Sequence, residues 1–160
     1  MTRDLLRRLR PVAIAALCAT ALGALGALAT DLGPWYYGLK KPSWQPPDWV
    51  FGPAWTLIFG LAAVSGVLAW QGAWSRARRI RIVVLFAINA VLNVGWSVLF
   101  FRLHRPDWAL LEVGLLWLSI LALIIGLWPY SRVASVLLVP YLAWVTFAGV
   151  LNMTIVSLNP

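Results

Sequence analysis

The chain has 160 residues, of which 62% are hydrophobic and 11% are charged, and its mean hydropathy is +0.83. A soluble fold of this size could not bury so much apolar surface. The formal net charge is +8, but the basic residues are scattered at the ends of apolar segments, which argues against a nucleic-acid partner. Composition therefore predicts a single polytopic domain over residues 1–160, an all-α membrane protein whose partner is the lipid bilayer.

Five apolar segments are long enough to cross a bilayer as helices. At about 20 residues per crossing, we expect a bundle of five transmembrane helices over residues 11–29, 48–71, 80–101, 107–128 and 133–157. Pro106 and Asp107 suit a first helical turn, and Ser131 suits an N-cap. Pro53 and Pro140 fall inside expected helices, where they are predicted to permit bends.

The first apolar segment has two interpretations. A basic stretch precedes it and Ala27-Leu28-Ala29 ends it, as in a cleaved signal peptide. The segment is longer than the usual signal core, however, and small residues recur at every fourth position, at Ala15, Ala19, Gly23 and Ala27. Such a face lets membrane helices approach closely, so we favour a retained helix, which an intact-mass measurement would test.

The distribution of Lys and Arg predicts the orientation. Nine of these residues fall at the N-terminus and in the connections after the second and fourth segments, against four on the opposite side. Because basic residues concentrate on the cytoplasmic side, we expect a multi-pass membrane protein with a cytoplasmic N-terminus and an extracytoplasmic C-terminus. The outer loop, residues 30–47, then faces outward.

An aromatic and proline-rich run over residues 35–51 begins in this loop and ends in the second apolar segment. Trp and Tyr rings have an apolar body and a polar tip, which suits the depth of lipid headgroups. The run is therefore predicted to lie at the membrane surface, above the helices.

Three of the expected helices carry aromatic or amide side chains at steps of three or four residues. These faces are Phe51, Trp55 and Phe59; Asn89, Asn93, Trp96, Ser97 and Phe100; and Pro140, Trp144, Ala148 and Asn152. Polar groups at membrane depth turn toward partners or a cavity. Counting residues from the outer side puts Trp55, Asn93 and Asn152 in one layer, with Trp144 deeper and the loop as a lid.

The combined faces predict an outward-opening pocket with flat aromatic walls and a few amides, suited to a large planar apolar ligand. Lys40 and Lys41 could meet acidic groups of such a ligand at the mouth. The alternative is that the aromatics only pack the bundle and the asparagines only join helices. Agreement in depth favours a pocket.

Other chemistry finds little support. His104 lies in a short outer loop and Cys18 is the single cysteine, so neither a metal site nor a nucleophile with its base is predicted. Glu112 lies about one turn inside the fourth segment, where an acid is costly. It suits either a proton-coupled role or a position near the helix N-terminus.

Several ordered motifs make the chain resemble the TspO/MBR family of tryptophan-rich sensory proteins and mitochondrial translocator proteins. The motifs are Trp35-Tyr36, Lys41-Pro42, Trp44 to Phe51, Trp55-Thr56, Asn93, Trp96-Ser97, Phe100-Phe101, Val139-Pro140-Tyr141, Trp144 and Leu151-Asn152. One departure concerns the C-terminal sterol-contact pattern of animal members, because no basic residue follows Leu151-Asn152-Met153.

The resemblance implies a five-helix bundle, commonly a homodimer, that binds porphyrins and other hydrophobic ligands beneath the first loop. Together with the short C-terminal tail, it leads us to expect a protein of the bacterial cell membrane. Protoporphyrin IX or haem is then the expected ligand, with no cofactor required. Residues and resemblance together give the expected ligand-binding set of Tyr36, Pro46, Phe51, Trp55, Asn93, Trp96, Trp144, Ala148 and Asn152.

The leading functional hypothesis is a membrane receptor or sensor for tetrapyrroles. A transporter of porphyrins or other small hydrophobic molecules is the first alternative. A light-dependent porphyrin-degrading enzyme is the second, and the resemblance implies redox roles for Trp55 and Trp144 in that case alone.

Overall fold

The computed structural model describes residues 2–160, with side chains from residue 9 onward. Its elements are α1 (Thr2–Ala29), α2 (Pro34–Gly38), η1 (Asp48–Val50), α3 (Phe51–Gly72), α4 (Arg76–Ser97), η2 (Val98–Arg102), α5 (Pro106–Leu127), α6 (Arg132–Val136) and α7 (Val139–Leu158). No strand occurs within this described range.

Five of its segments have the length and hydropathy to cross a membrane: Leu9–Ala29, Asp48–Gly72, Arg76–Arg102, Pro106–Leu127 and Arg132–Leu158. The predicted all-α fold with five membrane-spanning helices is confirmed. Of the basic residues that predicted the orientation, Arg3, Arg7 and Arg8 lie outside the described side chains.

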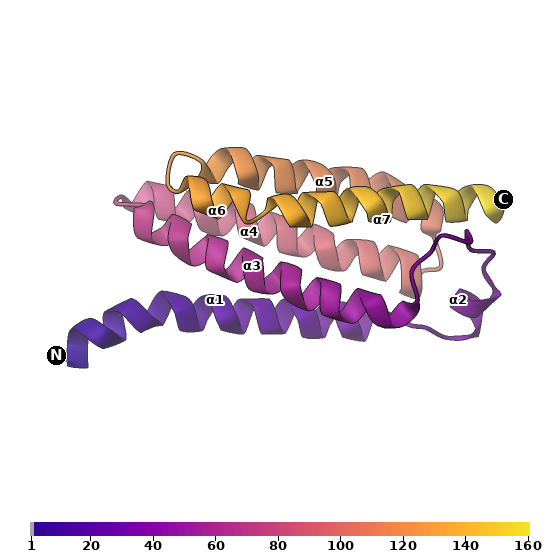
Figure 1. Ribbon diagram of the computed structural model, residues 1–160, viewed down its shortest axis with the longest axis horizontal. Coiled ribbons are helices and arrows are strands. Elements are labelled where there is room, and N and C mark those ends of the chain that lie inside the picture. The colour runs from indigo at the N-terminus through magenta and orange to yellow at the C-terminus, as the bar shows by residue number, and fades with distance from the viewer. Residues whose placement is uncertain (1) are drawn as a thin grey trace.

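The long helices run side by side along one axis (Figure 1). The N-terminus and the α3–α4 and α5–α6 connections lie at one end, here called the N-terminal end. The loop of residues 30–47, the α4–α5 connection and the C-terminus lie at the other, here called the loop end.

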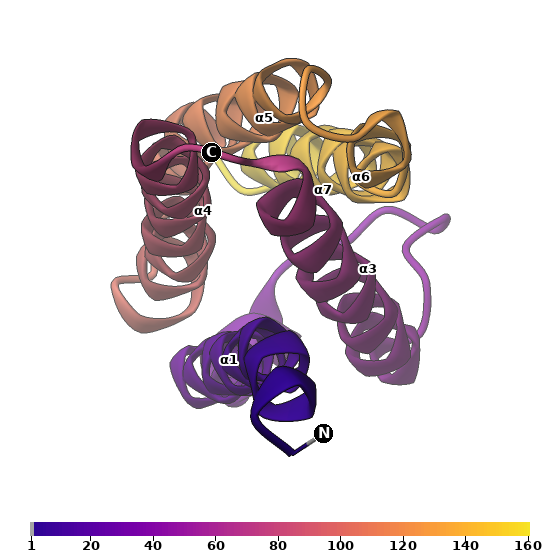
Figure 2. The ribbon, with the colours of Figure 1, turned by 90° about the vertical axis from the view of Figure 1, so that its left-hand side faces the viewer.

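Seen along the axis, the helices form a ring in the order α1, α3, α6 with α7, α5 and α4 (Figure 2). α5 packs against both α4 and α7, while α1 packs mainly against α3 and more sparsely against α4. α5 is accordingly the most buried of the five spans, and α1 is the least buried.

Local chemistry explains several helix ends. The Ser131 hydroxyl accepts a hydrogen bond from the Ala134 backbone N–H at 3.2 Å, so the predicted N-cap is confirmed. Ser75 caps α4 in the same way. Pro106 begins α5 and Asp107 lies in its first turn, as predicted.

Of the two predicted bends, the one at Pro53 is wrong. Pro53 is the third residue of α3, and a proline in the first turn lacks only an N–H that would have no helical partner. At Pro140 the prediction agrees with an interruption of the fifth span at Leu137 and Leu138, between α6 and α7. Pro140 is the second residue of α7, and its ring cannot continue a helix from the preceding turn.

At the loop end, α4 continues as a π-helical turn, η2, over Val98–Arg102. Phe100 and Phe101 are both buried there, although they are adjacent in sequence. Arg102, the last residue of this turn, donates a hydrogen bond to the Leu28 carbonyl oxygen, and its guanidinium lies 3.7 Å from the Asp31 carboxylate. The π turn therefore joins α4 and α1 at the loop end of the bundle.

Two groups of buried apolar residues stabilise the bundle. The larger occupies the centre and the N-terminal end, and includes Leu123 and Leu127 of α5 and Val145 of α7. The smaller lies at the loop end, where Tyr36 of α2 packs with Phe100 and other residues of η2, α5 and α7. Of the predicted ligand-binding residues, Phe51 and Trp96 pack against this smaller group, whereas Trp55 and Trp144 pack against the larger one.

Candidate functional site at the loop end

Tyr36 anchors the loop to the bundle. Its hydroxyl donates a hydrogen bond to Asp48 Oδ1 at 2.8 Å and accepts one from Gln45 Nε2 at 3.1 Å. Its ring lies 5.7 Å from that of Phe101, and Lys41 Nζ lies 3.4 Å from the Tyr36 ring centroid on a cation–π contact. These contacts fix the first half of the loop over the ends of the helices.

Burial shifts the pKa values of two groups in this cluster, Tyr36 and Lys41. Burial raises the pKa of Tyr36 far above its ordinary value, and the hydrogen bond to Asp48 adds to the rise. Burial lowers the pKa of Lys41, because it disfavours the charged form of either group. Tyr36 therefore remains a protonated hydrogen-bond donor at neutral pH.

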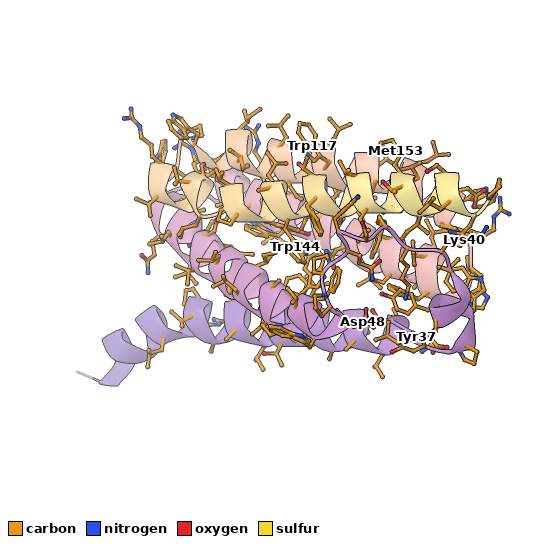
Figure 3. All side chains as sticks on the ribbon, turned by 45° about the vertical axis from the view of Figure 1, so that its right-hand side comes forward. Tyr37, Lys40, Asp48, Trp117, Trp144 and Met153 are labelled. Atoms are coloured by element: carbon orange, nitrogen blue, oxygen red, sulfur yellow. The ribbon has the colours of Figure 1, made fainter. Side chains whose placement is uncertain are left out.

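A second attachment joins the loop to the end of α7. The Lys40 backbone N–H donates to Asn159 Oδ1 at 2.9 Å, and Asn159 Nδ2 donates to the Lys40 carbonyl oxygen at 2.9 Å. Trp44, farther along the loop, lies edge-on to Phe147 of α7 at a centroid distance of 5.9 Å. Figure 3 shows Lys40 beside the C-terminal end of α7. The loop thus covers this end of the bundle, and the two hydrogen bonds between Lys40 and Asn159 attach it to the end of α7.

Aromatic rings line the boundary between α3 and α7. Trp144 lies 5.7 Å from Phe51 and 5.4 Å from Phe147, between centroids. The Trp55 ring centroid lies 6.0 Å from that of Tyr141. Tyr141 is one helical turn before Trp144 on α7. Figure 3 shows Trp144 between α7 and α3.

Trp144 precedes Asn152 by eight residues on α7 and is therefore deeper than Asn152, as predicted. The predicted depth relative to Trp55 is wrong, because Trp144 contacts Phe51 and lies nearer the loop than the contact between Trp55 and Tyr141 does. The predicted layer is also wrong for Asn152, because Tyr141, which contacts both Trp55 and Asn93, lies eleven residues before it on the same helix. The residue count assumed that α3 and α7 end at one level. The end of α7 instead reaches the loop at Lys40.

Buried amides form a network across α4, α5 and α7. Asn93 Nδ2 donates to the Tyr141 hydroxyl at 3.0 Å, and that hydroxyl donates to Asn89 Oδ1 at 3.2 Å. Asn89 Nδ2 donates to Ser119 Oγ at 2.9 Å. In an apolar interior each of these polar groups needs such a partner. The asparagines join helices here, as the packing alternative predicts.

A second amide lies closer to the loop. Trp96 Nε1 donates to Asn152 Oδ1 at 3.1 Å, and Asn152 Nδ2 donates to the Pro106 carbonyl oxygen at 2.8 Å. The Trp96 ring stacks on Phe100 at 5.3 Å. This contact connects the amide to the aromatic group under Tyr36.

The structure therefore connects most of the predicted residues in one region that extends from the loop toward the middle of the bundle. Phe51 contacts Trp144, Trp55 and Asn93 both contact Tyr141, and Trp96 contacts Asn152. Pro46 and Ala148 are partly buried, without a described polar contact. The rings are packed against one another, so an open pocket in this region stays a prediction.

Sequence reasoning missed three residues that complete the region. Tyr141 is the centre of the amide network, and Phe147 and Gln45 connect the loop to the layer below it. The spacing of Tyr141 and Phe147, three residues on either side of Trp144, is the signal that could have identified them.

Glu112 does not belong to this network. Both of its carboxylate oxygens are buried, and neither has a hydrogen-bond partner among the residues that the structure describes. An ideal Cβ on Gly95 of α4 would lie 3.8 Å from Glu112 Oε1, so the carboxyl group faces α4. No group of three or more His, Cys, Asp or Glu side chains that could hold a metal occurs within residues 9–160.

The family model of the TspO/MBR family matches residues 14–158. The chain belongs to the TspO/MBR family. It is 42% identical to the "Tryptophan-rich protein TspO" of Chlorobaculum tepidum over 150 residues, covering 91% of this chain and 95% of that relative. It is 36% identical to the "Tryptophan-rich sensory protein" of Cereibacter sphaeroides, covering 90% of this chain and 92% of the relative.

The similarity extends to animals. The chain is 34% identical to the human "Translocator protein" over 119 residues, covering 74% of this chain and 70% of that protein. The family assignment and the five apolar helices agree on a multi-pass membrane protein.

Proposed function

We propose that this protein is an integral membrane receptor or sensor that binds porphyrins, such as protoporphyrin IX or haem, at the loop end. The observation that carries the proposal is the layer of aromatic rings and amides beneath a fastened loop. The names of its relatives, a "Tryptophan-rich sensory protein" and a "Translocator protein", support a sensing or receptor role.

The closed arrangement supports a binding step that begins with opening of the loop. Because the rings of Phe51, Trp144 and Phe147 pack against one another, a planar ligand has to displace them or the loop above. The two hydrogen bonds between Lys40 and Asn159 are exposed, so they are among the least costly contacts to break. Aromatic faces then stack on the ligand ring, and the nearby lysines meet its acidic side chains.

The test is a titration of protoporphyrin IX into the protein in nanodiscs, in the dark, followed by the porphyrin absorbance. Wild-type protein should show saturable binding above that of empty nanodiscs. Trp144→Leu should weaken binding. Trp128→Leu is the matched control, because Trp128 is a half-exposed tryptophan near the N-terminal end of the bundle.

Equal, non-saturating uptake by both variants, wild type and empty nanodiscs would refute the proposal, because it would mean partition into lipid alone. Binding weakened equally by the two variants would refute the assigned position. A loss of porphyrin binding that is confined to Trp144→Leu supports the assigned position.

We include in the proposal the homodimer and the membrane orientation expected from the sequence. Light scattering of the purified protein measures the dimer, and a mass of one chain would refute it. Reporter fusions to each terminus measure orientation, and a cytoplasmic signal from the C-terminal fusion would refute the proposed arrangement.

A further inference from the structure

A large cavity lies at the N-terminal end, away from the aromatic layer. Its volume is about 1190 Å³, and it is enclosed on three sides by α1, α3 and α4. The lining is mostly aliphatic and aromatic, with Ala15 and Ala19 of α1 facing Phe59 and Phe86 of the other two helices. Figure 2 shows α1 standing apart from the tightly packed pair of α4 and α5 on this side of the ring.

The cavity is about as long as one leaflet of a bilayer is thick. It reaches from Arg10 to Leu22 on α1, from Gln71 to Phe59 on α3 and from Arg79 to Ala90 on α4. At 1.5 Å per residue these stretches are each about 17–18 Å long. Half of a typical hydrocarbon core is about 15 Å. The apolar end of the cavity therefore lies near the bilayer midplane, and the other end lies near the headgroups.

The charged lining residues gather at the headgroup end. Arg10 and Arg79 lie there together with Gln71. Arg79 is already held in place, because its Nε–H donates to the Ala73 carbonyl oxygen at 3.0 Å and its guanidinium carbon lies 4.9 Å from the Trp70 ring centroid. Those contacts use Nε and one face of the group, which leaves the terminal N–H groups for an anion.

A second, smaller hollow adjoins the first at this end. Its volume is about 440 Å³, it shares Trp70 and Arg79 with the large cavity, and it adds Arg76, Ser75 and Trp74. Three arginines and two tryptophans at the level of the headgroups form a setting for a phosphate group beside an apolar channel.

No acid balances these cations within residues 9–160. The acids there are Asp31, Asp48, Asp107 and Glu112, all on the loop-end half of the bundle, and both described ion pairs are at that end too. The cavity is thus apolar along one leaflet and cationic at one end.

We propose that this cavity binds one anionic phospholipid of the leaflet on the N-terminal side, with an acyl chain along α1 and the phosphate at Arg79 and Arg76. Charge complementarity selects this occupant. A second copy of the chain, packed symmetrically on this surface, would bring its own arginines to face these arginines. A lipid here would fill the space between α1 and the other helices, and the inference does not depend on porphyrin binding.

Cys18, the single cysteine of the chain, lines the cavity and is exposed, which provides a direct probe. The full-length protein is delipidated in a neutral detergent and mixed with phosphatidylglycerol, with phosphatidylcholine of the same chains, or with glycerol 3-phosphate. Native mass spectrometry measures bound lipid, and the rate of Cys18 alkylation by a maleimide measures occupation of the cavity.

We expect one phosphatidylglycerol to bind and to slow the alkylation of Cys18, whereas phosphatidylcholine binds more weakly and glycerol 3-phosphate gives no protection. Arg79→Gln should weaken binding of phosphatidylglycerol about fivefold, the value of one cation at an anionic lipid surface. Arg132→Gln is the matched control, because Arg132 also lies over a tryptophan ring at the N-terminal end, at 5.6 Å from Trp128, but does not line the cavity.

An unchanged alkylation rate of Cys18 without lipid in Arg79→Gln verifies that this variant keeps its fold. Equal affinity for the two lipids, or equal losses in the two arginine variants, would overturn the proposal. Protection by glycerol 3-phosphate alone would reassign the site to a free phosphate. A dimer in which Cys18 is protected without lipid would reassign the surface to a second copy.

Discussion

Removing one oxygen atom from Tyr141 tests whether the buried amide network stabilises the bundle. Tyr141 is 2% exposed, and its hydroxyl accepts from Asn93 at 3.0 Å and donates to Asn89 at 3.2 Å. Tyr141→Phe keeps the ring and deletes both hydrogen bonds. It leaves an amide N–H and an amide oxygen without their partner in an apolar interior.

The expected magnitude follows from the two lost bonds. A hydrogen bond between membrane helices contributes about 0.6 kcal/mol on average, and leaving a buried polar group unpaired costs about 1–3 kcal/mol. We expect Tyr141→Phe to lower the free energy of unfolding by about 1–3 kcal/mol. Because the phenyl ring keeps its packing, any gain from the substitution is small beside this loss.

The assay is reversible unfolding in mixed micelles at increasing fractions of a denaturing detergent, followed by circular dichroism. Tyr37→Phe is the matched control, because Tyr37 is 62% exposed and its hydroxyl has no described hydrogen bond. A double-mutant cycle of Tyr141→Phe with Asn89→Ala should give a coupling free energy of at least about 0.5 kcal/mol. If the two tyrosine variants are equally stable, the network does not stabilise the bundle, and this reasoning is refuted.

Three further substitutions have expected outcomes. Gly72→Ala should lower the melting temperature because its Cβ would clash with the Tyr130 carbonyl oxygen, whereas Gly60→Ala, with nothing within 4 Å, should raise it; the reverse order would contradict the close packing at this position. Glu112→Gln should increase the free energy of unfolding, because an amide costs less to bury than an unpartnered carboxylate, and a decrease would point to an ionised group with a functional partner. Asn159→Ala should accelerate hydrogen exchange in the loop that it fastens and leave exchange in α5 unchanged; unchanged exchange in the loop would mean that the fastening contributes little.

The sequence predicted the five spans because a bilayer requires about 20 apolar residues for each crossing. It also predicted two helix starts, at Ser131 and Pro106, because their chemistry is local. It could not predict that Asn89 and Asn93 share the hydroxyl of Tyr141. The choice of partner depends on which helices are neighbours, and no local signal determines that.

The small residues of α1 illustrate the same limit. Their four-residue spacing predicted a close approach of helices, and Gly23 does lie next to Phe59, where an added Cβ would meet the ring at 3.7 Å. Ala15 and Ala19 instead line the large cavity. Small side chains permit close packing, but they leave a space wherever the facing helices diverge.

The π turn of Val98–Arg102 has a consequence for comparing relatives. Such a turn is equivalent to one extra residue inserted into an α-helix. Deleting that residue would rotate everything beyond it by about 100°, so Arg102 would turn away from Leu28 and Asp31. Phe100 and Phe101 could then not both face inward. Any relative with a single-residue gap in this segment must connect the fourth and first helices by different contacts.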